Sequence, residues 1–151
     1  MLNVYLLGAR SEERYPPVQR KEPLPAPRSL YLLDLPGYGY AKASHTDRRA
    51  FRLLITHVLH RARLAGVLWL LDIRHEPSID DRAMQDLFAA RQTPVLAALT
   101  KSDKLPRTRR ERRAREVRET LALDQDQVIV TSARKDERIG ELGEAVRRLV
   151  G

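Results

Sequence analysis

The sequence predicts an α/β fold in which a mostly parallel sheet carries helices on both faces. Short, continuously apolar runs, which are typical of strands buried on both sides, alternate along the chain with longer segments of helical periodicity. Polar motifs follow several of these runs directly, where the strands are expected to end. Alternation of this kind indicates βαβ units, and ligands of such sheets bind beyond the carboxyl ends of the strands.

The regular part of the sequence begins at Leu30. The expected strands are Leu30–Leu35, Val67–Ile73, Pro94–Leu99 and Val128–Val130. The expected helices are Asp47–Ala65, a segment from Ser78 to about Arg91, Arg107–Leu123 and Ile139–Val150. Ser78 and Asp81 resemble a capping box at the start of the second helix, and Gly66 is placed to end the first.

Composition limits the class of protein. The 151 residues suit one domain, and a hydrophobic content of 42% favours a globular chain. The absence of cysteine excludes disulfides and thiolate metal sites. No apolar run approaches the ~20 residues of a membrane span, and no signal peptide is evident, so we expect a soluble cytoplasmic protein without a membrane partner.

A net charge of +8 favours a polyanionic partner such as RNA, or reflects arginine-rich solvated faces. Sequence-specific DNA binding is not expected.

The first polar motif is Asp34-Leu35-Pro36-Gly37, at the end of the strand that begins at Leu30. An aspartate at this point can orient a water molecule on a phosphate-bound Mg²⁺. A glycine three residues later lets a backbone amide approach a γ-phosphate, because no Cβ stands in the way. The same four residues are also typical of an ordinary turn.

Two further motifs follow later strands. In Thr100-Lys101-Ser102-Asp103 the carboxylate suits guanine, because it accepts from N1–H and the exocyclic amine together, whereas adenine offers no such pair. The aliphatic stem of Lys101 would lie over the face of the base. In Thr131-Ser132-Ala133 a small residue allows a backbone N–H to reach the guanine O6. Taken alone, Thr100–Asp103 also suits an ordinary charged loop after a strand. Thr131–Ala133 alone carries little information about function. The three motifs in this order, each after a strand, indicate descent from a guanine-nucleotide-binding domain.

The sequence around the first motif is more specific for one protein family than the motif itself. Asp34-Leu35-Pro36-Gly37-Tyr38-Gly39-Tyr40-Ala41-Lys42 resembles the signature of the EngB/YsxC family of bacterial ribosome-assembly GTPases, and Leu71–His75 and Leu99–Leu105 agree with it. The resemblance covers about residues 30–150, and we expect residues 30–151 to form an EngB-type G domain, from its third strand to its C-terminal helix. The guanine-nucleotide contacts that it implies are Asp34, Leu35, Pro36, Gly37, Thr100, Lys101, Ser102, Asp103, Thr131, Ser132 and Ala133.

The resemblance also implies a function. It implies a P-loop GTPase fold, GTP or GDP and Mg²⁺ as ligands, the large ribosomal subunit and its rRNA as partners, and a role in ribosome biogenesis, cell division and septation. Asp34 would contact Mg²⁺ through water. Tyr38 stands where many GTPases carry a water-positioning glutamine, so hydrolysis is expected to be slow without a partner. No catalytic residue is assigned, and GTPase activity is left open.

The sequence departs from the family at its N-terminal end. No Gly-x-x-x-x-Gly-Lys-Ser/Thr occurs in the 151 residues, and proline-rich residues 10–29 do not match the first switch, so residues 1–29 are expected to be a divergent or truncated segment. In one alignment Met1–Gly8 resembles the helix after the phosphate loop. In another, Asn3–Leu7 is the first strand and Gly8–Ser11 a degraded loop. Without a central first strand, the chain is expected to fold poorly or to recruit Asn3–Leu7 as a substitute.

The helix from Arg107 carries a dense group of arginines. The candidate RNA contacts within it are Arg109, Arg110, Arg112 and Arg113. The same residues also suit an ordinary solvated helix face. We therefore expect an EngB-type GTP-binding protein with impaired nucleotide binding. The alternatives are an RNA- or ribosome-binding remnant without enzymatic activity and a gene fragment produced by a mis-called start or a frameshift.

Overall fold

The structure is a computed structural model that describes residues 3–7, 30–35, 37, 45–61 and 64–150. The chain forms two compact units, residues 1–37 and 38–151. No helix in the described ranges is long and apolar enough to cross a lipid bilayer.

The first unit contains a two-stranded antiparallel ribbon. Strand β1 (Asn3–Leu7) pairs with strand β2 (Leu30–Asp34), with Asn3 opposite Asp34 and Leu7 opposite Leu30. The expectation that Met1–Gly8 continues a helix is therefore wrong. The segment is too short for a stable isolated helix, and its Val-Tyr pair favours a strand. The expectation of a strand at Asn3–Leu7 is correct, but this strand runs antiparallel to β2.

The second unit contains the parallel sheet that the sequence predicts. Strands β3 (Val67–Asp72), β4 (Val95–Thr100) and β5 (Val128–Val130) run parallel in the order β3-β4-β5. Every residue of β4 except the last is buried, as its continuous apolar run predicts. The α-helices in the described residues of this unit are α1 (His45–Leu59), α2 (Ile79–Ala90), α3 (Arg107–Leu121) and α4 (Ile139–Val150).

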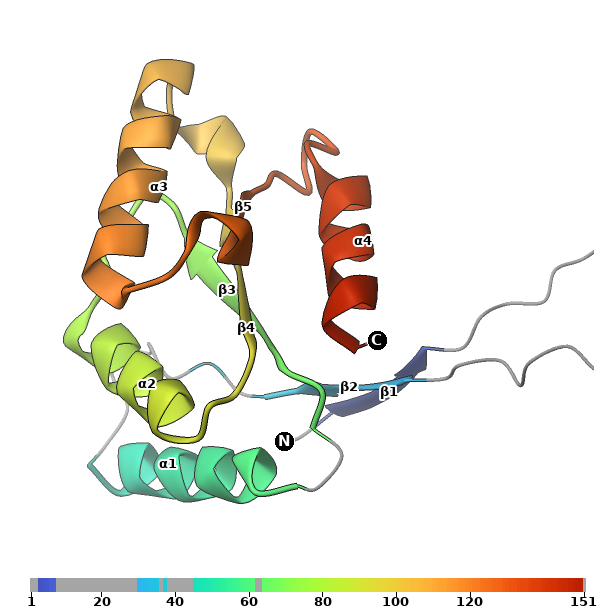
Figure 1. The fold of residues 1–151 in the computed structure, drawn as a ribbon. Coiled ribbons are helices and arrows are strands. Elements are labelled where there is room, and N and C mark those ends of the chain that lie inside the picture. The colour runs from blue at the N-terminus through green and yellow to red at the C-terminus, as the bar shows by residue number, and fades with distance from the viewer. Residues whose placement is uncertain (1–2, 8–29, 36, 38–44, 62–63, 151) are drawn as a thin grey trace, which may run out of the picture. The chain divides into compact units, whose positions relative to one another are not determined.

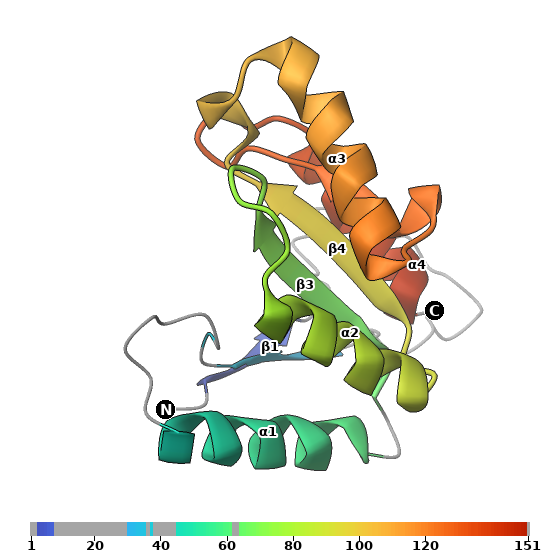
Figure 2. The ribbon, with the colours of Figure 1, turned by 90° about the vertical axis from the view of Figure 1, so that its left-hand side faces the viewer.

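Helices cover both faces of this sheet (Figure 1). Figure 2 shows α2 and α3 in front of the sheet and α4 behind it. On the face that carries α2, the rings of Trp69 and Phe88 meet edge to face with centroids 5.3 Å apart. On the other face, α4 places Ala145 against Leu96 and Ile129. The predicted α/β architecture is thus confirmed.

A local signal sets the start of α2 but not the end of α1. The predicted capping box is present: the Ser78 hydroxyl accepts from the Asp81 N–H at 3.1 Å, and the Ser78 N–H donates to the Asp81 carboxylate at 2.6 Å. The prediction that Gly66 ends the first helix is wrong, because α1 ends at Leu59. There His60 Nδ1 lies 2.7 Å from the Thr56 carbonyl, and the Arg61 N–H turns to the Val58 carbonyl, so the regular ladder stops.

The sheet register brings the strand ends to one edge. Asp72 at the end of β3 lies opposite Thr100 at the end of β4, and Leu99 lies opposite Val130 of β5. The loops that leave β3, β4 and β5 therefore start side by side (Figure 1). These loops include two of the three predicted motifs.

Candidate functional site

The chain leaves β4 in a tight turn at Lys101. Lys101 adopts a left-handed backbone conformation, with φ of 61°, and residues Ser102–Lys104 form one turn of 3₁₀ helix. The Leu105 N–H donates to the Ser102 carbonyl at 3.0 Å and closes the turn. Ser102 is fully buried, whereas Lys101 is exposed. We call residues 100–105 the base loop, after the role proposed below.

The base loop is bonded directly to the segment that follows β5. The Ser102 N–H donates to the Thr131 carbonyl at 3.1 Å, and the Ser132 hydroxyl donates to Asp103 Oδ1 at 2.6 Å. The Ser132 oxygen in turn accepts from the Lys135 N–H at 3.2 Å, which orients the hydroxyl proton towards Asp103. Two motifs that lie about thirty residues apart in the sequence thus form one structure, as their positions after neighbouring parallel strands predict.

The carboxylate of Asp103 is held in its ionised form. The hydrogen bond from Ser132 is the main cause that lowers the pKa of Asp103, and Lys104 and Arg134 act in the same direction. Only 8% of the Asp103 side chain is exposed, and its Oδ2 lies 4.0 Å from Lys104 Nζ. A fixed carboxylate at the carboxyl edge of a parallel sheet is an acceptor for a ligand that presents two adjacent N–H donors.

A second carboxylate, Asp72, organises the charges beside the base loop. Arg74 binds it with two nitrogens, Nε at 2.9 Å from Oδ1 and Nη2 at 2.6 Å from Oδ2. Lys101 Nζ donates to Oδ2 at 2.9 Å. The bonds from Arg74, followed by those from Lys101, hold the pKa of Asp72 well below its usual range. The amine of Lys101 is thereby drawn to the side of β3.

The first predicted motif lies in the other unit. Asp34 is the last residue of β2 and is exposed, as is Gly37, whereas Leu35 is partly exposed and Pro36 lies outside the described residues. Tyr38 to Lys42, which belong to the longer signature, also lie outside them. Among the described residues, no three His, Asp or Glu side chains are grouped to hold a metal ion. The water-mediated contact of Asp34 with Mg²⁺ therefore stays a prediction.

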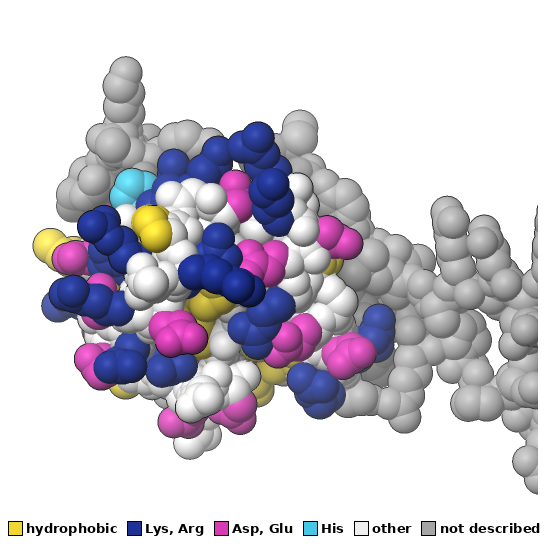
Figure 3. All heavy atoms as spheres, turned by 90° about the horizontal axis from the view of Figure 1, so that it is seen from above, with side chains coloured by type: hydrophobic (Ala, Val, Ile, Leu, Met, Phe, Trp, Pro, Cys, Tyr) yellow, Lys and Arg dark blue, Asp and Glu magenta, His cyan; other side chains and the backbone are white. Residues whose placement is uncertain are grey.

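The candidate RNA contacts on α3 have different environments. Arg109 and Arg112 are exposed, although Arg112 pairs with Glu116 at 2.9 Å. Arg113 contacts Glu116 at 3.0 Å and Glu76 at 3.3 Å. Arg110 is directed inwards and is described below. Figure 3, which looks down on the unit from above the view of Figure 1, shows basic side chains interspersed with acidic ones rather than a patch of one sign.

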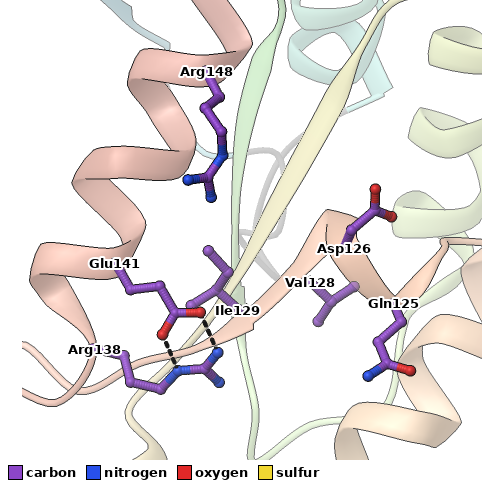
Figure 4. A pocket seen from close by; sticks show the side chains of 7 residues that line it. All are labelled: Gln125, Asp126, Val128, Ile129, Arg138, Glu141 and Arg148. Atoms are coloured by element: carbon purple, nitrogen blue, oxygen red, sulfur yellow. Dashed lines mark hydrogen bonds and ion pairs between the residues drawn. The ribbon is translucent and has the colours of Figure 1, made fainter.

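A separate hollow lies beside β5 and has a volume of about 540 Å³ (Figure 4). Arg138 and Glu141 form an ion pair at its wall, with Nε 2.7 Å from Oε2, and the pair lowers the pKa of Glu141. Arg148 of α4 lies on the same side. None of the predicted nucleotide-binding residues lines this hollow, so the candidate site is the loop edge and not the hollow.

Sequence reasoning missed three residues that shape this edge. Asp72 and Arg74 carried a recognisable signal, because Asp72 ends a buried strand next to the strand that precedes Thr100. Glu137 carried no such signal. It lies in the turn after Ser132, and its contacts to Ser102 and Arg110 depend on how that turn folds.

Comparison with known proteins identifies relatives of the chain. No protein-family model matches it. Many curated relatives match the chain, and those described here bear the name "Probable GTP-binding protein EngB". The protein from Listeria welshimeri serovar 6b is 40% identical over 115 residues, which are 72% of this chain and 59% of the relative. Those from Bacillus subtilis strain 168 and Gemmatimonas aurantiaca are 36% identical over 125 residues and 42% identical over 120 residues, covering 79% of this chain and 64% and 59% of their own lengths.

A solved structure has the same fold. It is titled "Crystal structure of a probable GTP-binding protein engB", superposes with a TM-score of 0.69 and is 15% identical. The match covers 80% of this chain and 77% of that chain. The chain spans about three fifths of the length of the curated relatives that it matches.

Proposed function

Since this chain belongs to the EngB family, we propose that its second unit carries the base-recognition half of a GTP-binding site. The observation that supports the proposal most strongly is the 2.6 Å hydrogen bond from Ser132 to Asp103. It joins the two loops that the sequence assigns to guanine and fixes an ionised carboxylate between them.

The proposed contacts follow from the chemistry of the base. Asp103 accepts from N1–H and from the exocyclic amine of guanine, and these two bonds to an ionised acceptor are stronger than bonds between neutral groups. Adenine presents no donor pair in this position, so Asp103 selects the base. The aliphatic stem of Lys101 covers one face of the ring, while its amine stays bonded to Asp72. A backbone N–H at Ala133 is the proposed donor to O6.

The 151 residues are proposed to bind guanine nucleotides weakly. They include no Gly-x-x-x-x-Gly-Lys-Ser/Thr, the motif whose amides and lysine hold the phosphates. Contacts to the base alone are worth a few kcal/mol, which corresponds to a dissociation constant of about 1 mM. Titration of this chain with a fluorescent GDP derivative should therefore show no sub-micromolar binding, and sub-micromolar affinity would contradict the proposal.

The wider role proposed for the chain is that of its family. We propose that an EngB-type domain with this base loop acts in large-subunit ribosome assembly and supports cell division, with rRNA as a partner. Mg²⁺ would add charge neutralisation at the phosphates and would meet Asp34 only through water. The supporting observation is the sequence likeness to EngB proteins over 72–79% of the chain.

Replacement of Asp103 by asparagine tests base selection directly. The amide of asparagine accepts from N1–H but donates where the carboxylate accepted, so it suits xanthine, which has a carbonyl in place of the exocyclic amine. We expect Asp103→Asn to reverse the preference between GDP and xanthosine diphosphate, changing the ratio of dissociation constants by about tenfold or more. Calorimetric or NMR titration with both nucleotides measures the ratio.

Asp126→Asn is the matched control for this experiment. Asp126 is an exposed aspartate in the turn Gln125–Gln127, and it has no part in the proposed site. It should leave the ratio unchanged. An Asp103→Asn protein that is folded, as judged by Trp69 fluorescence, and keeps the original preference would rule out base selection by Asp103.

A second candidate function is RNA binding by α3. The exposure of Arg107, Arg109 and Arg115 on one charged helix favours it. Such binding would weaken steeply as salt rises, because phosphate contacts release counterions. It would also be unaffected by Asp103→Asn. Ribosomal RNA binding with both properties, together with no guanine preference, would favour this function over the first.

A further inference from the structure

Glu137 lies in the segment after β5 and is bonded through its backbone to Ser132 of the same segment. Its N–H donates to the Ser132 carbonyl at 2.9 Å, and its carbonyl accepts from the Ser132 N–H at 3.2 Å. This reciprocal pair is an isolated antiparallel bridge. It holds the backbone of Ser132, whose hydroxyl binds Asp103.

The side chain of Glu137 contacts the other loop. Ser102, which is fully buried in the base loop, donates its hydroxyl to Glu137 Oε2 at 2.7 Å. Glu137 thus bonds the residue before Asp103 through its carboxylate and the partner of Asp103 through its backbone. No other residue in the described part of the site is shown to make both connections.

Arg110 of α3 completes the arrangement. Its Nη1 donates to both carboxylate oxygens of Glu137, at 2.9 and 3.0 Å, and its Nε donates to the Leu105 carbonyl at 3.0 Å. Leu105 closes the 3₁₀ turn that contains Ser102 and Asp103. Only 20% of the Arg110 side chain is exposed. A planar guanidinium suits this task, because it offers several donors in a fixed geometry.

The residues on either side of Glu137 have a strained backbone conformation. Asp136 and Arg138, on either side, have φ of 51° and 55°. Residues other than glycine rarely adopt this left-handed region, and they keep it only where surrounding bonds hold them there. The bridge to Ser132 and the pair with Arg110 are bonds of that kind.

We propose that Glu137, held by Arg110, is a positioning residue for guanine recognition, which fixes Ser102 and Ser132 so that the Asp103 carboxylate is aimed at the base. The inference rests on the proposed function. It assigns Arg110 to the base site, and it withdraws that residue from the candidate RNA surface.

The test compares Glu137→Ala with Glu141→Ala. The second change removes the carboxylate from another Arg–Glu pair, Arg138–Glu141, which lies at the wall of the hollow beside β5 (Figure 4). Without nucleotide, carboxyl NMR should show the pKa of Asp103 rising towards its ordinary value in Glu137→Ala and staying unchanged in Glu141→Ala. With nucleotide, the preference for GDP over ADP should fall at least threefold in Glu137→Ala alone.

Further variants keep the test decisive. Glu137→Gln retains an acceptor for Ser102 and should recover part of the guanine preference, and it replaces Glu137→Ala if that protein does not fold. In an Asp103→Asn background, Glu137→Gln should change the affinity for GDP no further. A folded Glu137 variant with unchanged Asp103 pKa and unchanged preference would overturn the inference. If the unmodified chain shows no guanine preference, the proposed function fails, and the pKa of Asp103 still decides whether Glu137 positions it.

Discussion

Asp72 illustrates how single residues hold the edge of the site in its present form. It binds Arg74 through both oxygens and Lys101 at 2.9 Å, and Lys101 has a left-handed backbone. Loss of the negative charge would leave two cations close together. It would also release the amine that keeps the stem of Lys101 in place.

The bonds to Asp72 make stability depend on pH. Because these bonds lower the pKa of Asp72 in the folded state below the unfolded value of about 3.9, its contribution is complete above that value and is lost as pH falls. We expect the free energy of unfolding to fall more steeply below about pH 4 in the unmodified chain than in Asp72→Asn. Urea unfolding followed by Trp69 fluorescence at several pH values measures this. Parallel curves for the two proteins would contradict the role given to Asp72.

The sequence predicts which site residues come together where the order of the strands alone decides it. The sequence places Asp103 and Ser132 after adjacent strands, and this alone brings them within reach. The same reasoning would have found Asp72. It could not find Glu137, since the contact of that residue with Ser102 depends on a turn in which both neighbours have a left-handed backbone, and Arg138 is of a type that rarely adopts it.

At the scale of the element, α3 ends in an unusual way. Ala122 follows Leu121 with φ of 48° and ψ of 48°, and both its own N–H and that of Leu123 donate to the Arg118 carbonyl. This is the position where helices usually carry glycine. The sequence predicts a helix to Leu123, because alanine normally continues one. The buried Leu123 side chain explains why the chain turns instead.

Ala122→Gly should stabilise the protein. Glycine removes the cost of a Cβ in the left-handed region, partly offset by the greater entropy of the unfolded chain, so we expect a gain of about 0.5–1 kcal/mol in the free energy of unfolding. Ala50→Gly, at an exposed position inside α1, should instead cost about 1 kcal/mol. Chemical denaturation measures the change in the free energy of unfolding for both variants, which should be opposite in sign. Destabilisation by Ala122→Gly would contradict this view of the helix end.

Gly66 has a packing role instead of a capping one. A Cβ built on it would lie 2.9 Å from the Leu149 side chain of α4, closer than carbon atoms tolerate. Gly66→Ala should therefore destabilise the protein by about 1–3 kcal/mol, as overpacking does.

Gly140→Ala is the matched control, because nothing lies within 4 Å of a Cβ at that position in α4. It should be neutral or mildly stabilising. Equal melting temperatures for Gly66→Ala and the unmodified chain would show that the loop before β3 does not pack against α4 as described.

At the scale of the whole molecule, alternating strands and helices were enough to predict the parallel sheet of the second unit and the helices on its two faces. The N-terminal segment was harder to predict. Five residues such as Asn3–Leu7 are too few for the repeat of their hydrophobic residues to distinguish a helix from a strand. Their pairing with β2 also joins segments that are distant in the sequence. The pattern of strand ends also predicts where a ligand binds, at the carboxyl edge of the parallel sheet.

Titration of the ¹⁵N-labelled chain with guanosine and adenosine monophosphates tests the account most directly. If the joined loops form a guanine site, guanosine monophosphate should shift the amide resonances of Thr100–Asp103 and Thr131–Ala133, whereas adenosine monophosphate at equal concentration should leave them largely unmoved. Equal responses to the two nucleotides, or shifts centred on the arginines of α3, would contradict the central claim that Asp103 and Ser132 form the base-recognition edge of this protein.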